Sequence, residues 1–310
     1  MERRIRVFAP ATIANLGPGF DVLGLALTEP GDLIEAELTG RHGVEIVEIT
    51  GDDGALSRDP LKNVASIAAA GVLRRAGSGS GMRLWLHKQM PLASGLGSSG
   101  ASSAVGAVAA NELLGAPLSR SELLLSAMEG ERAASGTAHA DNVAPSVLGG
   151  IVLVRSYHPF EVVSLPTPEA LRVAVVHPHC HVSTADARRL LKDRAFGLEA
   201  IVPNLGNIAA LVTALCTGDL DMLGRSIEDR LIEPLRATLI PGFDGVKSAA
   251  LQAGALGCSI AGSGPSIFAF AANDESAERI GSAMRIAFRA VGLESDVWSG
   301  KVSAQGARVV

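Results

Sequence analysis

The sequence of 310 residues contains little cysteine and few aromatic residues. Its three cysteines, Cys180, Cys216 and Cys258, are widely spaced and form neither a CxxC pair nor a disulfide framework. Such usage is typical of a reducing compartment, so we expect a cytoplasmic location. The chain has 8 Phe, 2 Trp and 1 Tyr against 35 Gly, which indicates a globular protein with small-residue packing and many loops.

An excess of basic residues is also absent. There are 27 Lys and Arg against 32 Asp and Glu, a formal net charge of -5. This sign argues against binding of nucleic acid or an anionic membrane by bulk electrostatics, so we expect no partner of either kind. Any bound phosphate must then be held by local groups. The sequence has no internal repeat, low-complexity tract or long run of one charge, which argues against a solenoid and a binding tail.

Continuous apolar segments of the kind that form signal peptides are missing as well. Near the N-terminus, Pro10, Asn15, Pro18 and Asp21 interrupt the apolar region that a signal peptide needs, so we expect mature protein. Residues 89–111 carry no charge over a length that could cross a bilayer, but they are rich in Ser and Gly. A buried phosphate loop followed by a helix explains this segment better.

The length, at roughly 150 residues per domain, predicts two domains that can each bury a core. A proline-rich loop between expected strands at 151–154 and 172–176 is the predicted domain seam. Residues 101–114 predict a helix, and a capping box at 119–122 opens the next one. Hairpins and helix pairs without regular βαβ alternation predict an α+β fold. Further expected strands are 4–9, 32–38, 44–49, 82–88, 258–261 and 266–271, and further expected helices are 63–76, 184–191, 204–217, 220–230 and 245–253.

The segment from Ser94 to Gly100 follows Pro91 and opens directly into a helix. Its three glycines allow backbone amides to converge on an anion, and the helix N-terminus adds partial positive charge. Ser98 and Ser99 supply hydroxyl groups. The segment therefore predicts an anion site, and the alternative interpretation is a tight turn capped by serine.

Two common nucleotide motifs match this segment only in part. Gly95, Gly97 and Gly100 satisfy GxGxxG, but the dinucleotide fingerprint needs a strand ending in an acidic residue soon after the helix. Residues 118–132 predict another helix there instead. A Walker loop would end in Lys-Ser or Lys-Thr, which this run lacks. A nicotinamide oxidoreductase remains a competing enzyme class, which a titration with NAD(P)H would separate.

The segment PLASGLGSSGAS resembles the phosphate-binding motif of the GHMP kinase superfamily. APATIANLGPGFDVLGLAL and AGSGPSIFAF resemble its first and third motifs, so the resemblance spans nearly the whole chain. Within the superfamily, NLGPGFDVLGLAL, HADNVAPSVLGG, STADARRLL and EPLRATLIPGF are similar to the homoserine kinase family. The resemblance implies two domains: residues 1–165, an ATP-binding domain similar to ribosomal protein S5 domain 2, and residues 166–310, a ferredoxin-like α/β sandwich.

The same resemblance implies transfer of the γ-phosphoryl group of ATP to the side-chain hydroxyl of L-homoserine, on the route to threonine. It implies Mg²⁺ with Ser99 and Glu131 as ligands, and one hydroxyl and one carboxylate suit an ion that keeps bound water. Asn63 and Val64 would contact the nucleotide. The remaining implied nucleotide contacts are Pro91, Leu92, Ala93, Ser94, Gly95, Leu96, Gly97, Ser98, Ser99, Gly100 and Ala101.

L-homoserine is a zwitterion, so its site needs a carboxylate, a guanidinium group and polar groups around the hydroxyl. Without the resemblance, Asp21 would be interpreted as a turn former, Arg188 as solvated and His139 as a structural histidine. With it, Thr184 lies near the reacting hydroxyl. The implied substrate-binding residues are Asn15, Asp21, His139, Asn142, Thr184, Arg188 and Arg236, of which the two arginines take the carboxylate.

The chain departs from other GHMP kinases at the position of the general base. Members similar to mevalonate kinase pair a Lys in the first motif with an Asp near the second, whereas ATIAN has no lysine and Asn142 stands at the aligned position. Asp141 lies one residue away. We therefore assign no general base, and we expect Asn142 and Thr184 to act as catalytic residues that orient the hydroxyl while the γ-phosphate accepts the proton.

Several alternatives stay open from the sequence alone. His177, His179 and His181 alternate as metal ligands on a strand would, but Pro178 breaks regular pairing. The glycine turn 261–266 is expected to buttress the phosphate loop. A kinase for another small alcohol and a catalytically silent nucleotide sensor are competing functions. Apolar helices with few aromatic residues suit a homodimer.

Overall fold

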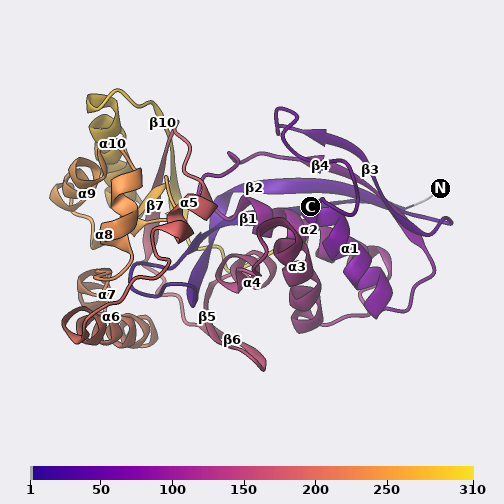
Figure 1. Cartoon of the computed structure of the whole chain (residues 1–310), viewed down its shortest axis with the longest axis horizontal. Helices are drawn as coiled ribbons and strands as arrows, with labels where there is room; N and C mark the ends of the chain where they lie inside the picture. The colour runs from indigo at the N-terminus through magenta and orange to yellow at the C-terminus, as the bar shows by residue number, and fades with distance from the viewer. Residues whose placement is uncertain (1–2) are drawn as a thin grey trace.

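Two β-sheets form the framework of the protein, and the computed structural model describes residues 3–310. One sheet has seven strands and the other has four. Figure 1 shows helices α1 to α4 beside the larger sheet, and α9 and α10 at the end of the molecule that holds the smaller one. Each sheet thus has its own helices, as the expected α+β fold with two domains requires.

The larger sheet is built around two long antiparallel strands, β1 and β2, whose register pairs Ile5 with Ala36 and Ala9 with Asp32. β4 pairs antiparallel with β2 and parallel with β3. β5 and β6 extend the sheet from β2 as a hairpin, and the C-terminal strand β11 returns to pair with β1. The strands are β1 (Arg4–Ala14), β2 (Leu23–Thr39), β3 (Gly43–Thr50), β4 (Gly81–His87), β5 (Ile151–Tyr157), β6 (Phe160–Leu165) and β11 (Arg308–Val309).

The helices on the larger sheet pack closely because their contact residues are small. α2 is buried along nearly its whole length, and a Cβ atom on Gly106 would lie 2.1 Å from the carbonyl oxygen of Ala65 in α1. α3 begins with the expected capping box between Ser119 and Glu122. The charge-free residues 89–111 are therefore a loop and a buried helix. These helices are α1 (Val64–Arg75), α2 (Ser98–Leu113), α3 (Arg120–Ser135) and α4 (Ala140–Leu148).

The smaller sheet has the order β10-β7-β9-β8, and all its pairings are antiparallel. Every residue of β7 and β9 is buried, and α9 and α10 pack against this sheet. Phe268 and Phe270 lie edge to face with ring centroids 5.2 Å apart. The elements are β7 (Arg172–Pro178), β8 (Gly257–Ile260), β9 (Ile267–Ala271), β10 (Ser295–Lys301), α9 (Phe243–Gln252) and α10 (Asp274–Ala290).

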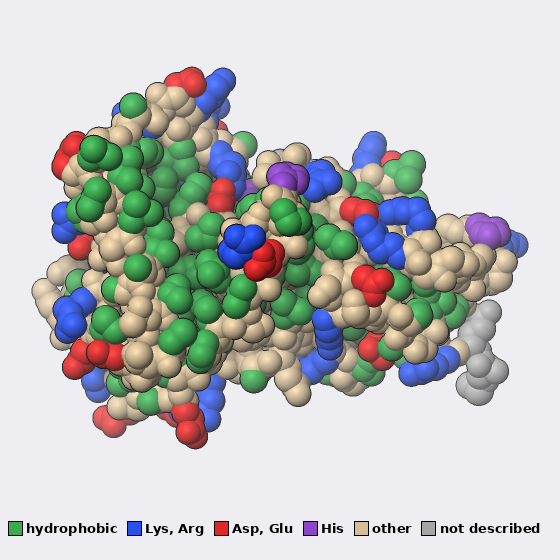
Figure 2. Space-filling view, turned by 90° about the horizontal axis from the view of Figure 1, so that it is seen from below, with side chains coloured by type: hydrophobic (Ala, Val, Ile, Leu, Met, Phe, Trp, Pro, Cys, Tyr) green, Lys and Arg blue, Asp and Glu red, His purple; other side chains and the backbone are tan. Residues whose placement is uncertain are grey.

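The chain between β7 and α9 forms helices that connect the two parts. α6 is long and apolar enough to cross a membrane by length and composition alone, and only 22% of that stretch is buried. Figure 2, which views the molecule from below, shows apolar side chains gathered on the side that holds α6 in Figure 1. The helices are α5 (Thr184–Arg189), α6 (Leu198–Thr217), α7 (Leu220–Arg225), α8 (Glu233–Arg236) and a 3-10 turn (Ala237–Leu239).

Most expected elements are present with shifted ends, but the helix expected over 220–230 is wrong in its second half. The helix ends at Arg225. The Asp229 carboxylate accepts hydrogen bonds from the backbone amides of Leu231, Ile232 and Glu233, at 2.8 to 3.0 Å. These bonds turn the backbone into α8. A helix that continued to residue 230 would not make this turn.

Two elements carry no ordinary sequence signal. The expected seam loop contains β6, because its prolines flank the strand and Pro159 lies in the hairpin turn. α4 has Pro145 in its interior, and its N-cap residue His139 makes no side-chain capping bond. β6 is held by its pairing with β5 in the larger sheet, and α4 is held by packing against that sheet.

Candidate active site

Two cavities meet at the start of α2. The larger has a volume of 530 Å³ and is lined from the N-terminal loop, the glycine-serine segment, α3, α4, α5, α8 and the turn at 262–263. The smaller has a volume of 290 Å³ and lies between the start of α1, the end of β4 and the start of α2. Ala93, Ser98 and Ser99 line both. A ligand that fills both cavities therefore crosses the N-terminus of α2.

The glycine-serine segment is shaped to bring backbone amides to this junction. Gly97 is the N-cap of α2 in the left-handed region, with φ 66°, and provides no side-chain cap. A Cβ atom there would lie 2.0 Å from Thr12 Oγ1, and one on Gly95 would lie 2.4 Å from the Ala261 carbonyl oxygen. Both positions therefore require glycine. An uncapped helix N-terminus of this kind binds anions through its first amides.

The glycine turn at 261–266 supports this segment, as the sequence predicts. The Ser266 amide donates to the Ser94 carbonyl at 3.2 Å, and the Gly262 amide donates to the Ala14 carbonyl at 3.3 Å. Gly262 and Ser263 also line the larger cavity. The turn is therefore both a buttress and a wall of the site.

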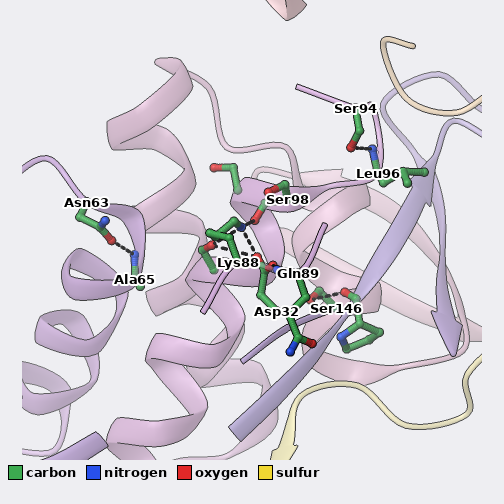
Figure 3. Close-up of polar contacts among 12 residues, drawn as sticks. Asp32, Asn63, Ala65, Lys88, Gln89, Ser94, Leu96, Ser98 and Ser146 are labelled. Atoms are coloured by element: carbon green, nitrogen blue, oxygen red, sulfur yellow. Dashed lines mark hydrogen bonds and ion pairs between the residues drawn. The ribbon is translucent and has the colours of Figure 1, made fainter. Parts of the chain in front are cut away.

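The smaller cavity is an apolar slot. Leu56, Val64, Leu86 and Leu92 line it together with Asn63. The Asn63 side chain is already engaged, because its Oδ1 accepts from Ala65 N at 3.0 Å (Figure 3). Its Nδ2 donates to Ser57 O, also at 3.0 Å. Asn63 thus caps α1 and fixes one wall of a slot that suits a flat apolar base.

A hydroxyl and a carboxylate lie together beside the junction. Ser99 Oγ donates to Glu131 Oε2 at 2.6 Å, and His139 Nδ1 lies 3.3 Å from Glu131 Oε1. Within residues 3–310, no group of three or more His, Cys, Asp or Glu could hold a metal ion. One carboxylate and one hydroxyl fit Mg²⁺, which is commonly bound through few protein groups plus phosphate oxygens and water.

The loop before β2 carries a carboxylate into the larger cavity. Asn15, Leu16 and Asp21 adopt left-handed backbone conformations, with φ of 73°, 49° and 59°. Asn15 holds the loop, because its Nδ2 donates to Gly262 O at 2.8 Å and its Oδ1 accepts from Asp21 N at 3.1 Å. Arg188 Nη2 lies 2.9 and 3.1 Å from the two carboxylate oxygens of Asp21. The Arg188 side chain is thus held by Asp21 at the cavity, where the resemblance places it as a substrate-binding residue.

Arg236 lies buried in the same cavity, where no carboxylate of residues 3–310 forms an ion pair with it. Its Nη1 donates to the Gly262 carbonyl at 2.8 Å, and its guanidinium lies 4.9 Å from the centroid of the Phe20 ring. Burial, together with repulsion from Arg188, lowers the pKa of Arg236 to about 10. The side chain stays cationic at neutral pH.

Unpartnered buried atoms define what this cavity can bind. Among the described residues, atoms on cavity-lining residues that lack a hydrogen-bond partner include Nε of Arg188, Nε of Arg236, Oδ1 of Asp141 and Oγ of Ser98. Burial, reinforced by the nearby Asp21 carboxylate, raises the pKa of Asp141 to about 7. Polar atoms buried without partners are costly, so a ligand is expected to pair with them. Two cationic donors and a carboxylate in one cavity complement a zwitterion.

Two further polar side chains lie between the charged groups and the start of α2. Thr12 Oγ1 donates to Asn142 Oδ1 at 3.0 Å, which fixes the amide with Nδ2 as its donor end. Thr184 Oγ1 lies 3.2 Å from Ser263 Oγ. An amide and a hydroxyl orient an acceptor but are not strong bases.

The structure brings most of the predicted site residues together. Asn63, Val64 and Leu92 line the smaller cavity, and Pro91, Leu96 and Ala101 line neither cavity. Leu96 and Ala101 are buried in the hydrophobic core. Those lining the larger cavity are Asn15, Asp21, Ala93, Ser94, Gly95, Gly97, Ser98, Ser99, Gly100, Glu131, His139, Asn142, Thr184, Arg188 and Arg236.

Sequence reasoning missed Lys88, which lines the smaller cavity, and treated Asp141 only as an alternative to Asn142. A lysine at the end of the apolar strand LWLHK was the available signal for the first. Of the three alternate histidines, His177 Nδ1 lies 3.1 Å from Ser266 Oγ, His179 Nε2 lies 3.0 Å from Asp296 Oδ2, and His181 lines the larger cavity.

Comparison with known proteins adds to this geometry. Family models described as "GHMP kinases N terminal domain" and "GHMP kinases C terminal" match residues 63–150 and 211–290. A homoserine kinase from Chlorobium phaeobacteroides (strain BS1) is 49% identical, and the alignment covers 98% of each chain. The crystal structure of homoserine kinase from Cytophaga hutchinsonii superposes with a TM-score of 0.97 at 50% identity, covering 100% of this chain and 98% of that one. Mevalonate kinase from L. major, at 19% identity and a TM-score of 0.73, covering 97% of this chain and 99% of that one, shares the fold.

Proposed function

The chain belongs to the homoserine kinase family of the GHMP kinases, and we propose that its two joined cavities bind ATP and L-homoserine for phosphoryl transfer. Homoserine kinases convert ATP and L-homoserine into ADP and O-phospho-L-homoserine, a step of threonine biosynthesis. The observation that carries the proposal is the set of unpartnered buried atoms in the larger cavity, because they complement a zwitterion beside an anion-binding helix N-terminus.

The nucleotide is proposed to occupy the smaller cavity with its base between the leucine side chains and its triphosphate at the junction. The first amides of α2 and the hydroxyl groups of Ser98 and Ser99 then surround the phosphate oxygens. Phosphoryl transfer depends mainly on positioning and on stabilising these negative oxygens. Asn63 contributes by fixing the start of α1.

Ser99 and Glu131 are the residues that would hold Mg²⁺. When bound there, the ion would neutralise charge on the phosphate oxygens. Glu131 Oε1 lies near His139, so the carboxylate is oriented before any ligand binds.

The amino acid is proposed to bind with its carboxylate on Arg188 and Arg236 and its ammonium on Asp21 and Asp141. Arg188 pairs with Asp21 in the structure. When the substrate binds, Arg188 would contact its carboxylate and Asp21 would contact its ammonium group. Charge-assisted hydrogen bonds to both ends would select amino acids over neutral alcohols.

The hydroxyl of homoserine is proposed to lie at Asn142 and Thr184. Asn142 Nδ2 can donate to the hydroxyl oxygen, because Thr12 already occupies Oδ1. The O–H bond of homoserine breaks, a bond forms from its oxygen to the γ-phosphorus, ADP leaves, and the transferred phosphoryl oxygens receive the proton. No side chain is required as a base.

The test of the function is Mg²⁺-dependent release of ADP from ATP with L-homoserine, mevalonate, galactose, L-serine or no acceptor. We expect turnover with homoserine and at least about tenfold lower kcat/KM with L-serine, which is one methylene shorter. ATP binding without turnover on any acceptor would instead favour a silent nucleotide sensor. Faster turnover of a neutral alcohol would favour another kinase of the superfamily.

Asp141 gives a pH prediction. The carboxylate, whose surroundings include Asp21, His139 and Arg188, has a pKa raised to about 7 and attracts the substrate ammonium only when ionised. We therefore expect kcat/KM for homoserine to fall as the pH drops through about 7. Measured pH profiles should lose this limb in Asp141→Asn, with about tenfold lower kcat/KM at pH 8 from the lost charge-assisted bond.

The exposed Asp244→Asn in α9 is the control, which should keep the acidic limb. If Asp141→Asn lost several orders of magnitude in kcat while homoserine still bound, Asp141 would be the general base and the proton assignment above would be wrong.

The exposed face of α6 supports a homodimer. Leu198, Val202 and Leu205 are 73%, 61% and 59% exposed, and Glu199 is the one charged residue of this 20-residue helix. Two copies of the chain can cover such a face by two-fold association, because the same apolar surface then packs against itself.

The free cysteines fit the proposed cytoplasmic location. Residues 1–165 and 166–310 are the proposed domains.

We expect light scattering after size-exclusion chromatography to give twice the mass of the chain. Val202→Glu should give the single-chain mass, because an ionised carboxylate would be buried at the interface. Ile286→Glu, at a 67% exposed apolar residue of α10, is the matched control and should stay dimeric. A monomeric wild-type chain, or partition of the chain onto lipid vesicles through this helix, would contradict the dimer.

A further inference from the structure

A buried ion pair lies directly beneath the first turn of α2. Lys88 follows β4 and Asp32 lies in β2, and their side chains are 1% and 0% exposed. Lys88 Nζ bonds the Asp32 carboxylate, the Ser98 carbonyl at 3.1 Å and Ser102 Oγ at 2.9 Å. Figure 3 shows the lysine reaching between the aspartate and Ser98. One of the three acceptors, Asp32, lies in the sheet, and the other two, Ser98 and Ser102, lie in the helix that carries the anion site.

Asp32 is itself held from two sides. Its Oδ1 accepts from the Gln89 amide at 3.1 Å, and its Oδ2 accepts from Ser102 Oγ at 3.2 Å. The pair therefore links β2, the end of β4 and the first turn of α2. The position of Ser98, which lines both cavities, depends on this link.

The pair is also oriented. Lys88 lines the smaller cavity, whereas Asp32 lines neither cavity. The lysine is thus the member of the pair nearer the nucleotide slot, and its positive charge lies at the positive end of the α2 dipole. Burial lowers the pKa of Lys88, and the Asp32 carboxylate opposes this shift, so the lysine depends on its partner for its charge.

Stability alone does not explain this pair. Replacing a buried ion pair by uncharged groups of similar volume is often neutral or stabilising, because two charges must lose their water. The bonds to the helix and the side on which the cation lies point to the nucleotide instead.

We propose that Lys88, held by Asp32, is a positioning residue for the phosphates of ATP: it fixes the first turn of α2 and places positive charge beneath that turn, beside the nucleotide slot. The inference rests on the proposed function and deepens it, since it separates recognition of the phosphates from recognition of the base. Loss of the pair should weaken binding of ATP and leave binding of adenosine unchanged.

The experiment is calorimetric titration of ATP and adenosine, with Mg²⁺ present, into the full chain and the double variant Asp32→Asn/Lys88→Met. The double variant carries the test because Lys88→Met alone leaves the Asp32 carboxylate buried without its cation. We expect the ratio of the adenosine Kd to the ATP Kd to fall about tenfold, as loss of one favourable charge contact implies. The KM for ATP should rise to the same extent, and the KM for homoserine should change less than about twofold.

Arg172→Met/Asp274→Asn, which removes a more exposed ion pair, is the control. Arg172 Nη2 lies 3.3 Å from Asp274 Oδ2, and neither residue lines a cavity. The ratio of the adenosine Kd to the ATP Kd in this control variant should equal that of the wild type. Lys88→Arg, which keeps the charge, should retain most of the preference for ATP, and a tenfold fall of the ratio in this variant would contradict a role for the charge.

An unchanged ratio in Asp32→Asn/Lys88→Met would overturn the inference, and so would an equal fall in the control pair, since both indicate a merely structural role. A wild-type chain that bound ATP no better than adenosine would contradict the proposed function itself.

Discussion

Arg236→Ala is expected to lower kcat/KM for homoserine by about 100-fold to 1,000-fold, mainly through a higher KM. Arg236 is 4% exposed, its Nε has no partner among the described residues, and it lies in the proposed carboxylate site. A hydrogen bond to a charged group contributes about 1.5 to 3 kcal/mol, and two such bonds give the stated range after partial compensation by Arg188. Steady-state rates with homoserine varied at saturating ATP measure this effect, and the KM for ATP should not change.

Arg230→Ala is the matched control for this prediction. Arg230 precedes α8 and pairs with Glu228 in solvent, at 3.1 Å, so its loss should leave both KM values as they are. Arg236→Lys should recover only part of the affinity, since an ammonium group lacks the planar fork of donors. An Arg236→Ala enzyme with unchanged KM for homoserine would show that the carboxylate binds elsewhere.

Glu131→Gln is expected to lower kcat by about 1,000-fold, with homoserine affinity nearly unchanged. The variant removes the one carboxylate at the proposed Mg²⁺ site while keeping side-chain size, and stabilisation of the transferring phosphoryl group by charge is the main source of rate in such reactions. Single-turnover rates over a range of Mg²⁺ concentrations measure the loss, and the half-saturating concentration of Mg²⁺ should rise.

Glu129 provides the comparison on the same helix. Its carboxylate binds Arg74 and Arg75 at 2.6 and 2.5 Å, outside both cavities. Glu129→Gln should keep kcat and Mg²⁺ dependence, with at most a small loss of thermal stability. If the two variants behaved alike, the effect of Glu131 would be structural and the metal assignment would be wrong.

The anion site could be predicted from the sequence because its determinants are local. Gly97 and Ser98 lie at the start of the helix whose amides form the site. Residue type and spacing within this one segment are therefore enough to indicate converging amides. The same locality explains why the capping box at Ser119 and Glu122 was found.

The electrostatic part of the site could not be predicted in this way, because its partners are distant in the chain. Arg188 and Asp21 are separated by 167 residues and Lys88 and Asp32 by 56. Nothing local distinguishes Arg188 from a solvated arginine. Only the fold decides that Asp141 Oδ1 is buried without a partner among the described residues, while Asn142 is fixed by Thr12.

Errors in the expected secondary structure have the same physical origin. Residues 226–230 have a helical composition, but Asp229 binds three following backbone amides and redirects the chain. α4 forms around Pro145 because it packs on the larger sheet, and such tertiary contacts override local propensity.

The most direct test of the central claim is a crystal structure of the chain with L-homoserine, Mg²⁺ and a non-hydrolysable ATP analogue. The account predicts the homoserine carboxylate on Arg188 and Arg236 and its hydroxyl beside Asn142, about 3 to 3.5 Å from the γ-phosphorus at the start of α2. A homoserine molecule bound in the opposite direction, or a triphosphate away from the first turn of α2, would contradict it.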